Sequence, residues 1–382
     1  MKLEYVIGGV VGLMVLSGLA VYLQNAKRDG AMMQKTGSTS QASSTDTTMP
    51  SKEELLTDAM KARKYQKAPE LGGIAGYLNT DGKPITISQF KGKSVVLIDF
   101  WTYSCINCQR TLPYVTAWYG KYKDQGLVII GVHTPEFSFE KNQQNVADAL
   151  KRFGITYPVV LDNTYGTWNN FSNQFWPRKY LIDIDGYIVY DHAGEGNYDE
   201  TETAIQKALQ ERAARLHMGD SMVPNDMIHP AGVMEVNNAM VGSPETYFGS
   251  ARNEYLQNGT KGTEDSQRLI LPQSPSLNSL YLGGTWNFTP EYAEGSVGSD
   301  ILYHFSSKSV YFVGASKDGA DLDITLDGKP VVIGAGADVK NSSMHVKEDR
   351  LYKVIEASGY GDHVLKIHVR AGVLEAFTFT FG

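Results

Sequence analysis

Two cysteines three positions apart are the residues of this chain best suited to chemistry. Cys105 and Cys108 are the only cysteines among its 382 residues. A disulfide scaffold needs several bridges and a four-cysteine zinc site needs two pairs, so both are excluded. Residues i and i+3 share one face of a helix, which lets two sulfurs close a bond of about 2.05 Å. The spacing favours a redox pair, and the alternatives are a static disulfide or two inert buried thiols.

The elements on either side of the pair favour the redox interpretation. Residues 95–101 form an apolar run typical of a buried central strand, and a helix is expected from near Cys105 towards Lys121. A helix N-terminus carries unpaired N–H groups and a partial positive charge, which stabilise a thiolate. We therefore expect Cys105 to attack a substrate disulfide and Cys108, one turn deeper, to resolve the mixed disulfide.

Residues 52–72 are charged and compatible with a helix, and strand-like and helix-like runs alternate over residues 73–216, as they do in α/β domains. Further strands are expected at 127–132, 180–183 and 187–190, the last two joined by the turn Asp185-Gly186. Helices are expected at 139–153 and 201–216, and a hairpin turn at 79–82. This order predicts a mixed central sheet with helices on both faces.

The segment around the cysteines resembles the active-site stretch of thioredoxins. The matching features are a carboxylate six residues before the first cysteine, a flanking aromatic residue, a helix proline and a Trp-Pro turn. They are Asp99, Trp101, Pro113 and Trp176-Pro177. This resemblance implies a thioredoxin fold and the exchange of thiols and disulfides over residues 52–216.

Within that superfamily the chain resembles the TlpA-like, or redoxin-like, group. It also resembles the soluble part of DipZ-type cytochrome c biogenesis proteins. The phrases that recur there are residues 100–108, 131–137, 176–183 and 243–249. The resemblance covers roughly residues 68–382. It implies that the chain is a thiol-disulfide oxidoreductase.

The resemblance also implies roles for residues near the cysteines. Asp99 lies in an apolar strand, where burial raises the pKa of a carboxyl group, and is expected to take and return the proton of the resolving cysteine. Pro177 in the cis form is expected to set a backbone edge opposite the sulfurs for a substrate strand. Glu136 is expected to tune the cysteine pKa or relay protons. Trp101 and Trp176 are expected to contact the substrate. The alternatives are a structural aspartate, an ordinary turn proline and a surface glutamate.

Two rival chemistries are compatible with parts of the same segment. Thr102 and Cys105 fit the T-x-x-C pattern of peroxiredoxins, but those enzymes need a proline where Asp99 stands. His133 and Glu136 are three residues apart and could bind a metal, yet no third ligand is evident. We expect no metal and no cofactor, and a peroxidase remains the enzymatic alternative.

Residues 274–382 predict a second, all-β domain after a long connecting segment at 217–273. Its period-two runs at 352–355, 364–369 and 377–381, with a turn at Asp327-Gly328, indicate a β-sandwich or jelly roll. In DipZ-type relatives this zone resembles a carbohydrate-binding module, so a glycan is a candidate ligand. Three aromatic residues could stack on sugar or fill the core: Trp286, Tyr292 and Tyr303. Four aspartates could bind calcium or sit in turns: Asp318, Asp321, Asp323 and Asp327.

The N-terminus predicts a transmembrane helix. Residues 5–23 are uncharged and, at about 1.5 Å per residue, long enough to span a bilayer. We expect a signal anchor at 1–28 and a flexible tether at 29–51, with cleavage near residues 18–20 as the alternative. The flanking Lys and Arg residues weakly favour the opposite orientation, but the tether favours an extracytoplasmic body. The net charge of −7 makes nucleic acid an improbable partner.

The expected function is that of a membrane-tethered, extracytoplasmic reductant. Its partners would be disulfide-bearing exported proteins, with cytochrome c maturation as one setting. Because a single span is expected, electrons would come from a separate membrane donor of the CcdA/DsbD type. Besides the peroxidase, the alternative is a binding or scaffold protein that acts through its C-terminal β-sandwich.

Overall fold

The computed structural model describes residues 58–218 and 223–382. The predicted membrane anchor at 1–28 and tether at 29–51 lie outside these ranges. Within the two described ranges, no helix combines the length and the apolar character needed to cross a membrane. We refer to residues 58–216 as the α/β unit and to residues 246–382 as the β unit.

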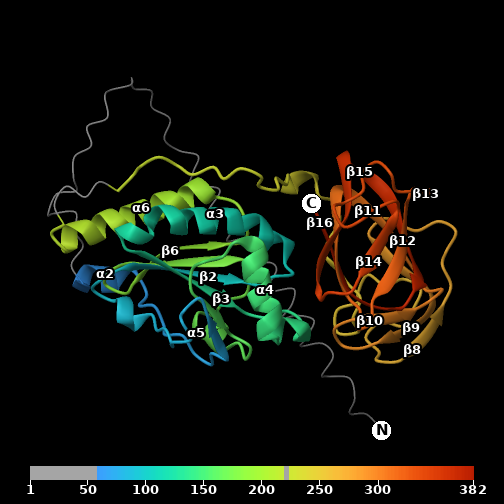
Figure 1. Ribbon diagram of the computed structural model, residues 1–382, viewed down its shortest axis with the longest axis horizontal. Coiled ribbons are helices and arrows are strands. Elements are labelled where there is room, and N and C mark those ends of the chain that lie inside the picture. The colour runs from blue at the N-terminus through green and yellow to red at the C-terminus, as the bar shows by residue number, and fades with distance from the viewer. Residues whose placement is uncertain (1–57, 219–222) are drawn as a thin grey trace, which may run out of the picture. The chain divides into compact units, whose positions relative to one another are not determined.

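A six-stranded sheet with the order β1-β4-β3-β2-β5-β6 forms the centre of the α/β unit (Figure 1). Strands β2, β3 and β4 are parallel, whereas β1, β5 and β6 are antiparallel to their neighbours, which confirms the predicted mixed sheet. The strands are β1 Gly76–Leu78, β2 Val95–Trp101, β3 Leu127–His133, β4 Val159–Leu161, β5 Arg178–Ile182 and β6 Ile188–Ala193. The helices are α2 Asp58–Lys64, α3 Ile106–Tyr122, α4 Gln143–Phe153, α5 Gly166–Asn170 and α6 Tyr198–Arg215.

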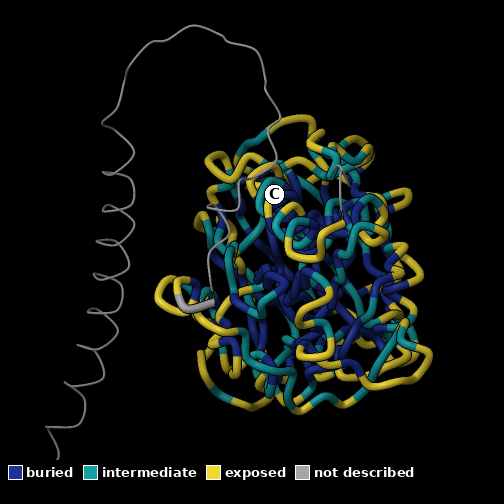
Figure 2. Tube along the Cα trace, turned by 90° about the vertical axis from the view of Figure 1, so that its left-hand side faces the viewer, coloured by how far each residue is buried: buried dark blue, intermediate teal, exposed yellow. Residues whose placement is uncertain are grey.

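Strand β2 is buried on both faces, and its side chains alternate between two cores. Val95, Leu97 and Trp101 pack with residues of α3, α4 and α6. The intervening Val96 and Ile98 face the opposite core, which includes residues beside α5. Asp99 is in phase with the first set, because successive side chains of a strand point to opposite faces. The strand therefore directs this carboxylate towards α3, the helix that carries the cysteines. Figure 2 shows such buried segments in the interior of the trace.

Two local predictions in the α/β unit need correction. The helix expected at 139–153 is divided into a 3₁₀ turn, Ser138–Lys141, and α4. The division occurs because the Asn142 side chain caps α4 by accepting a hydrogen bond of 2.8 Å from the Gln144 N–H. The turn at 79–82 follows β1 but forms no hairpin, since β1 pairs with the distant β4.

The β unit is built of antiparallel strands around one apolar core. Its strands are β7 Thr246–Tyr247, β8 Ser266–Leu269, β9 Ser279–Phe288, β10 Ala293–Ser296, β11 Asp300–Ala315, β12 Ala320–Leu326, β13 Lys329–Pro330, β14 Ser343–Val346, β15 Arg350–Ala371 and β16 Val373–Phe381. Strand β9 lies against β11 without pairing to it, so the sheet folds back over its core. The predicted turn at Asp327-Gly328 joins β12 to β13, and both residues have positive φ, 53° and 75°.

The strand pairing of the β unit differs from the sequence prediction in two places. Strands β7 and β8 lie inside the segment predicted as a connection, 217–273, yet β7 pairs with β16 and β8 with β9. The two strands predicted at 352–355 and 364–369 are parts of one strand, β15. They are continuous because β15 pairs along almost the whole of β11, with an irregularity beside Ser307 and Ser309.

A β-bulge directs one side chain of the β unit onto the α/β unit. Between its pairs with β11 at Ala376 and Thr378, strand β16 leaves Phe377 unpaired. Phe377 contacts the rings of Phe137 and Phe139, with centroid distances of 5.1 and 4.9 Å. A bulge re-aims a side chain in this way because it shifts the alternation of the strand by one residue.

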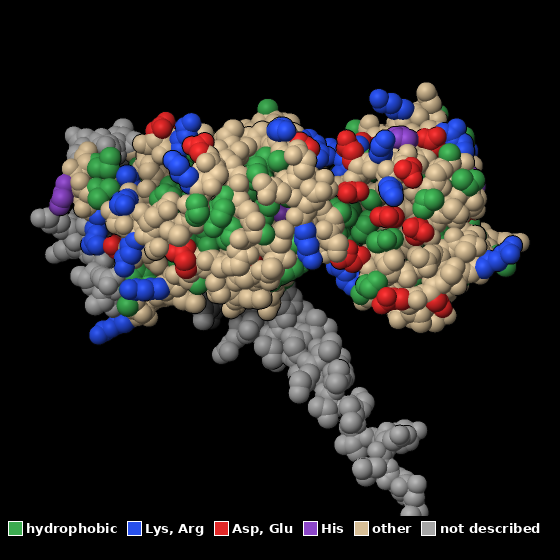
Figure 3. Space-filling view, turned by 60° about the horizontal axis from the view of Figure 1, so that its bottom comes forward, with side chains coloured by type: hydrophobic (Ala, Val, Ile, Leu, Met, Phe, Trp, Pro, Cys, Tyr) green, Lys and Arg blue, Asp and Glu red, His purple; other side chains and the backbone are tan. Residues whose placement is uncertain are grey.

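The exposed surface carries charges of both signs. Figure 3 shows Lys and Arg interspersed with Asp and Glu over the face that it draws. Val332 and Ile333, in the loop after β13, are 80% and 90% exposed. Isolated exposed apolar residues of this kind are common on protein surfaces and need no special explanation.

Candidate functional site

The two cysteines lie at the start of α3, as the sequence predicts. Cys105 is the N-cap residue and is partly exposed, whereas Cys108 is only 1% exposed. Both are free thiols, and the Cys108 N–H donates to the Cys105 sulfur over 3.4 Å. Burial raises the pKa of the Cys108 thiol well above its ordinary value, and the adjacent Cys105 raises it further. The outer sulfur is thus accessible, and the inner one needs a base before it can attack.

A buried acid–base pair lies in the core below Cys108. Asp99 and Lys179 are each 1% exposed, and the Lys179 Nζ is 3.7 Å from the Asp99 Oδ1. Burial raises the pKa of Asp99 to about 6, and the Lys179 charge limits that rise. Burial lowers the pKa of Lys179, while Asp99 opposes this shift. Asp99 also raises the pKa of Cys108 through its charge, so the three groups interact.

Glu140 is a second buried carboxylate, which the sequence did not single out. It is fully buried, and its Oε1 accepts hydrogen bonds from the Thr102 hydroxyl and from the N–H and hydroxyl of Ser104. Its Oε2 accepts from the backbone N–H groups of Glu136 and Phe137, at 2.5 and 3.0 Å. Burial raises the pKa of Glu140 to about 7. Glu140 therefore ties the segment before Cys105 to the loop after β3.

Glu136 is held by residues of the β unit. Its Oε1 accepts hydrogen bonds from the Tyr247 hydroxyl at 2.8 Å and from the Arg252 Nη1 at 2.7 Å. The Arg252 guanidinium also lies 3.6 Å from the centroid of the Tyr247 ring. This carboxylate is already paired with Arg252. The structure does not test its expected influence on the cysteines, which stays a prediction.

The Trp-Pro turn lies beside the outer cysteine. The Trp176–Pro177 peptide bond is cis, and the Trp176 indole donates to the Thr134 carbonyl over 3.0 Å. Trp176 lines the same cleft as Cys105. Trp101, in contrast, is fully buried against His133, so the structure does not place it where a substrate could reach it.

A cleft of about 650 Å³ surrounds Cys105. The α/β unit contributes one wall, which includes Trp176, Glu136 and Glu195, and the opposite wall comes from residues after 237. Arg110, on α3, is 2% exposed and forms an ion pair of 3.2 Å with Glu195. The Arg110 guanidinium also stacks over the ring of Tyr311 in the β unit, 5.4 Å from its centroid.

The rival binding sites are not supported by the described residues. Burial lowers the pKa of His133 to about 3, and its Nε2 faces the Thr102 hydroxyl at 3.3 Å, away from a shared site with Glu136. Trp286 and Tyr303 are fully buried in the β core, which leaves neither free to stack on a sugar. Three of the four aspartates already have partners: Asp321 and Asp327 each contact a histidine, and Asp323 forms an ion pair with Arg370.

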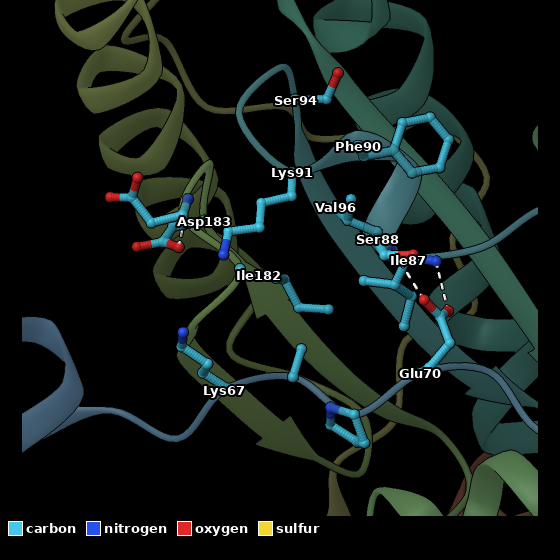
Figure 4. Close-up of a pocket in the computed structure, with 14 residues that line it drawn as sticks. Lys67, Glu70, Ile87, Ser88, Phe90, Lys91, Ser94, Val96, Ile182 and Asp183 are labelled. Atoms are coloured by element: carbon cyan, nitrogen blue, oxygen red, sulfur yellow. Dashed lines mark hydrogen bonds between the residues drawn. The ribbon is translucent and has the colours of Figure 1, made fainter. Parts of the chain in front are cut away.

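A smaller cavity of about 270 Å³ lies near the first residues of β2, at the opposite end of that strand from the cysteines. In Figure 4, the Glu70 carboxylate accepts hydrogen bonds from the backbone N–H groups of Ile87 and Ser88. Asp183, in its wall, is paired with the buried Lys61. The acidic groups labelled in this cavity already have partners within the protein, so it offers no evident reactive group.

Two family models match the chain, and together they cover both units. Residues 61–209 match the model described as Redoxin. Residues 243–382 match the model described as Thioredoxin like C-terminal domain. The second match begins before β7, in agreement with the pairing of β7 and β8 within the β unit.

The chain is also similar to curated proteins of known name. It is 38% identical over 320 residues to Protein DipZ of Mycobacterium tuberculosis, an alignment that covers 82% of this chain and 43% of that protein. It is 30% identical over 152 residues to the thiol-disulfide oxidoreductase YkuV of Bacillus subtilis, covering 40% of this chain and 99% of YkuV. It is 32% identical over 127 residues to the thiol-disulfide oxidoreductase ResA of Bacillus cereus, covering 33% of this chain and 70% of ResA. The chain therefore spans less than half the length of its mycobacterial relative.

Proposed function

The chain belongs to the thioredoxin-like thiol-disulfide oxidoreductases, and from this premise we propose that it reduces disulfides of exported proteins through a Cys105/Cys108 cycle. The observation that carries the proposal is the asymmetry of the pair. One sulfur is accessible at a helix N-terminus, and the other is buried one turn deeper, next to a carboxylate with a raised pKa.

In the first step, the Cys105 thiolate attacks one sulfur of a substrate disulfide. The substrate S–S bond breaks as the bond to Cys105 forms, and the other substrate sulfur leaves as a thiolate that takes a proton from water. The N–H of Cys108 points at the attacking sulfur and favours its negative charge before the attack.

In the second step, Cys108 resolves the mixed disulfide. The ionised Asp99 accepts the Cys108 proton, and the resulting thiolate attacks the Cys105 sulfur. A Cys105–Cys108 bond forms, the bond to the substrate breaks, and the departing thiolate takes a proton from water. Asp99 returns its proton to Cys108 when the disulfide is reduced again. The substrate has then gained two electrons and the protein has lost two. The buried Lys179 stabilises the Asp99 carboxylate that the next turnover requires.

We place the body outside the cytoplasm, tethered through the predicted span at 5–23, because the resemblance to DipZ-type proteins and the tether composition both favour it. A dithiol donor must return two electrons to the Cys105–Cys108 disulfide after each cycle. A membrane carrier of the CcdA/DsbD type would supply them, and cytochrome c maturation would be one pathway served.

The test is to trap the first intermediate. Cys108→Ser, mixed with a disulfide-bearing protein, should accumulate a mixed disulfide at Cys105 that mass spectrometry detects. Cys105→Ser should form none and should lose insulin reduction. A reduction potential near about −270 mV would support a reductant, whereas one near about −120 mV would indicate an oxidant. Exchange activity retained by Cys105→Ser would contradict the proposed cycle.

A further inference from the structure

The β unit covers part of the surface around the active-site cysteines. Ile106, the residue that follows Cys105, is 2% exposed and belongs to an apolar cluster that spans both units. Its partners from the β unit in that cluster include Tyr311, Val313 and Phe377. A redox-active thiol on an open, flat surface could contact a folded partner protein over a wide area. Here the cleft beside Cys105 remains open.

The size of that cleft limits what can enter it. Its volume of about 650 Å³ falls within the range of small-ligand pockets, about 300–1,000 Å³, whereas a folded partner usually needs about 800 Å² of surface on each side. The backbone N–H and C=O of Trp176, in the wall of the cleft, form no hydrogen bond with other described residues. Such a free edge can pair with an extended chain.

The charge of the cleft adds a second selection. Its lining includes three carboxylates, Glu136, Glu195 and Glu245, and one guanidinium, Arg252, so acidic groups outnumber basic ones. Glu136 is paired with Arg252, and Glu195 with Arg110. Glu245 is exposed and forms no ion pair among the described residues, and desolvation together with the nearby Glu136 raises the pKa of its carboxyl group to about 7. It is therefore the lining carboxylate without a cationic partner, and an incoming cation would stabilise its ionised form.

We propose that the β unit forms a fixed selectivity wall, so that the cleft accepts extended cysteine-containing segments with a basic residue beside the disulfide, and that Glu245 recognises this basic residue. This inference rests on the proposed function, because it names the substrate class of the same reaction. Electrostatic complementarity of this kind chiefly affects encounter and register, so we expect a moderate effect on kcat/KM.

The test uses three short peptides that differ at one position. Each carries one cysteine linked by a disulfide to thionitrobenzoate, and the residue after the cysteine is Lys, Gln or Glu. With the full chain, we expect kcat/KM to be about three- to tenfold higher for the Lys peptide than for the Glu peptide. Glu245→Gln should bring this ratio close to one, and Glu245→Lys should invert it. Glu254→Gln, which changes an exposed glutamate outside the cleft lining, should leave the ratio unchanged.

Hydroxyethyl disulfide separates this inference from the proposed function. If wild type reduces this small neutral disulfide but the peptides react at equal rates, the selectivity wall is refuted while the redox cycle stands. The same conclusion follows if Glu245→Gln keeps the wild-type peptide ratio. If neither the small disulfide nor any peptide is reduced, the proposed function itself fails. A disulfide in a stably folded protein should be reduced at least tenfold more slowly than the Lys peptide, and an equal rate would also refute the wall.

Discussion

At the scale of single residues, we propose that the buried carboxylate of Asp99 controls how fast Cys108 can attack. The Cys108 thiol has a raised pKa and is shut off from solvent, so its proton needs an internal acceptor. Asp99, with a pKa raised to about 6, is ionised at neutral pH and is directed towards α3 by the phase of β2. General base catalysis by a positioned group typically contributes about 10²–10⁴-fold.

We expect Asp99→Asn to slow the resolving step about 100-fold at pH 7, because the amide cannot accept the proton. Acid quenching and mass spectrometry would follow the lifetime of the mixed disulfide. In wild type the rate should fall as the pH drops through about 6, since protonation removes the base, and the variant should lack this inflection. The first attack by Cys105 should change less than about threefold. Equal lifetimes in the two proteins would rule out Asp99 as the base.

Glu140 makes a separate contribution at this scale, visible as stability rather than rate. Its pKa is raised to about 7 in the folded protein, against about 4.3 in an unfolded chain. The folded state therefore binds the Glu140 proton more tightly than the unfolded chain does. The stability that this gives the folded state is present below about pH 4 and is lost as the pH rises towards 7.

Glu140→Gln does not titrate, so it should lack this loss. The free energy of unfolding of wild type minus that of Glu140→Gln should fall by about 3 kcal/mol between pH 4.5 and 8. Urea unfolding at several pH values measures the difference directly. The glutamine should also lower stability overall, because its NH₂ group faces N–H donors that the carboxylate now accepts. A difference that rises with pH would contradict the assignment.

At the scale of elements, the sequence predicted what is locally coded. Strand β2 occupies the predicted residues, and α3 begins one residue after the predicted Cys105, because a continuous apolar run and a helix N-terminus are both local signals. Strands β7 and β8 were missed because they have only two and four residues and show no apolar alternation. The sequence does show a lysine, Lys179, within an apolar strand, which indicates a buried charge. It does not show which residue pairs with that lysine, because Asp99 lies on another strand.

The residues around the cysteines show the same limit more strongly. Glu140 bonds Ser104 across 36 positions, and Arg252 bonds Glu136 across 116. Contacts of such separation depend on how whole elements pack, and a single sequence carries no direct record of them. Of the residues that line the cleft, Cys105, Glu136 and the Trp-Pro turn were predicted as site residues from the sequence, because each lies in or beside a distinctive local pattern.

The buried ammonium group of Lys61 links helix α2 to the central sheet. The Lys61 ammonium bonds Asp183 and Asp185 of the β5–β6 turn and Glu211 of α6. Burial alone would lower the pKa of Lys61, but these three carboxylates raise it, so the lysine stays charged. The three carboxylate oxygens lie within 4.8 Å of one another and would repel without it.

Lys61→Met should destabilise the protein by about 3–5 kcal/mol at pH 7, because it leaves buried carboxylates uncompensated. Thermal and urea unfolding would measure this loss. Lys64→Met, which changes an exposed lysine of the same helix, should shift stability by less than about 0.5 kcal/mol. Matching losses in the two variants would show that helix propensity, not the ion cluster, is responsible.

At the scale of the whole molecule, a one-residue irregularity in a strand connects folding of the β unit to access at the active site. Ala376 and Phe379 face the β core, while the bulge turns Phe377 onto Phe137 and Phe139. Those two phenylalanines flank Ser138, whose hydroxyl donates to Glu291 of the β unit over 2.7 Å. The loop that contains Glu136 and Glu140 is thus held in place by its contacts with the β unit.

Phe377→Ala should loosen this contact while leaving both units folded. It removes a ring that is 2% exposed, so the expected loss of stability is about 3 kcal/mol. The cleft should open more often, and iodoacetamide should alkylate Cys105 several times faster than in wild type. Phe379→Ala is the matched control, since it deletes an equally buried ring two residues away that faces the β core instead. Its stability should fall by a similar amount, yet Cys105 should react at the wild-type rate below the melting temperature. If both variants expose Cys105 equally, the bulge at Phe377 has no special part in shielding the site, and general destabilisation accounts for the effect.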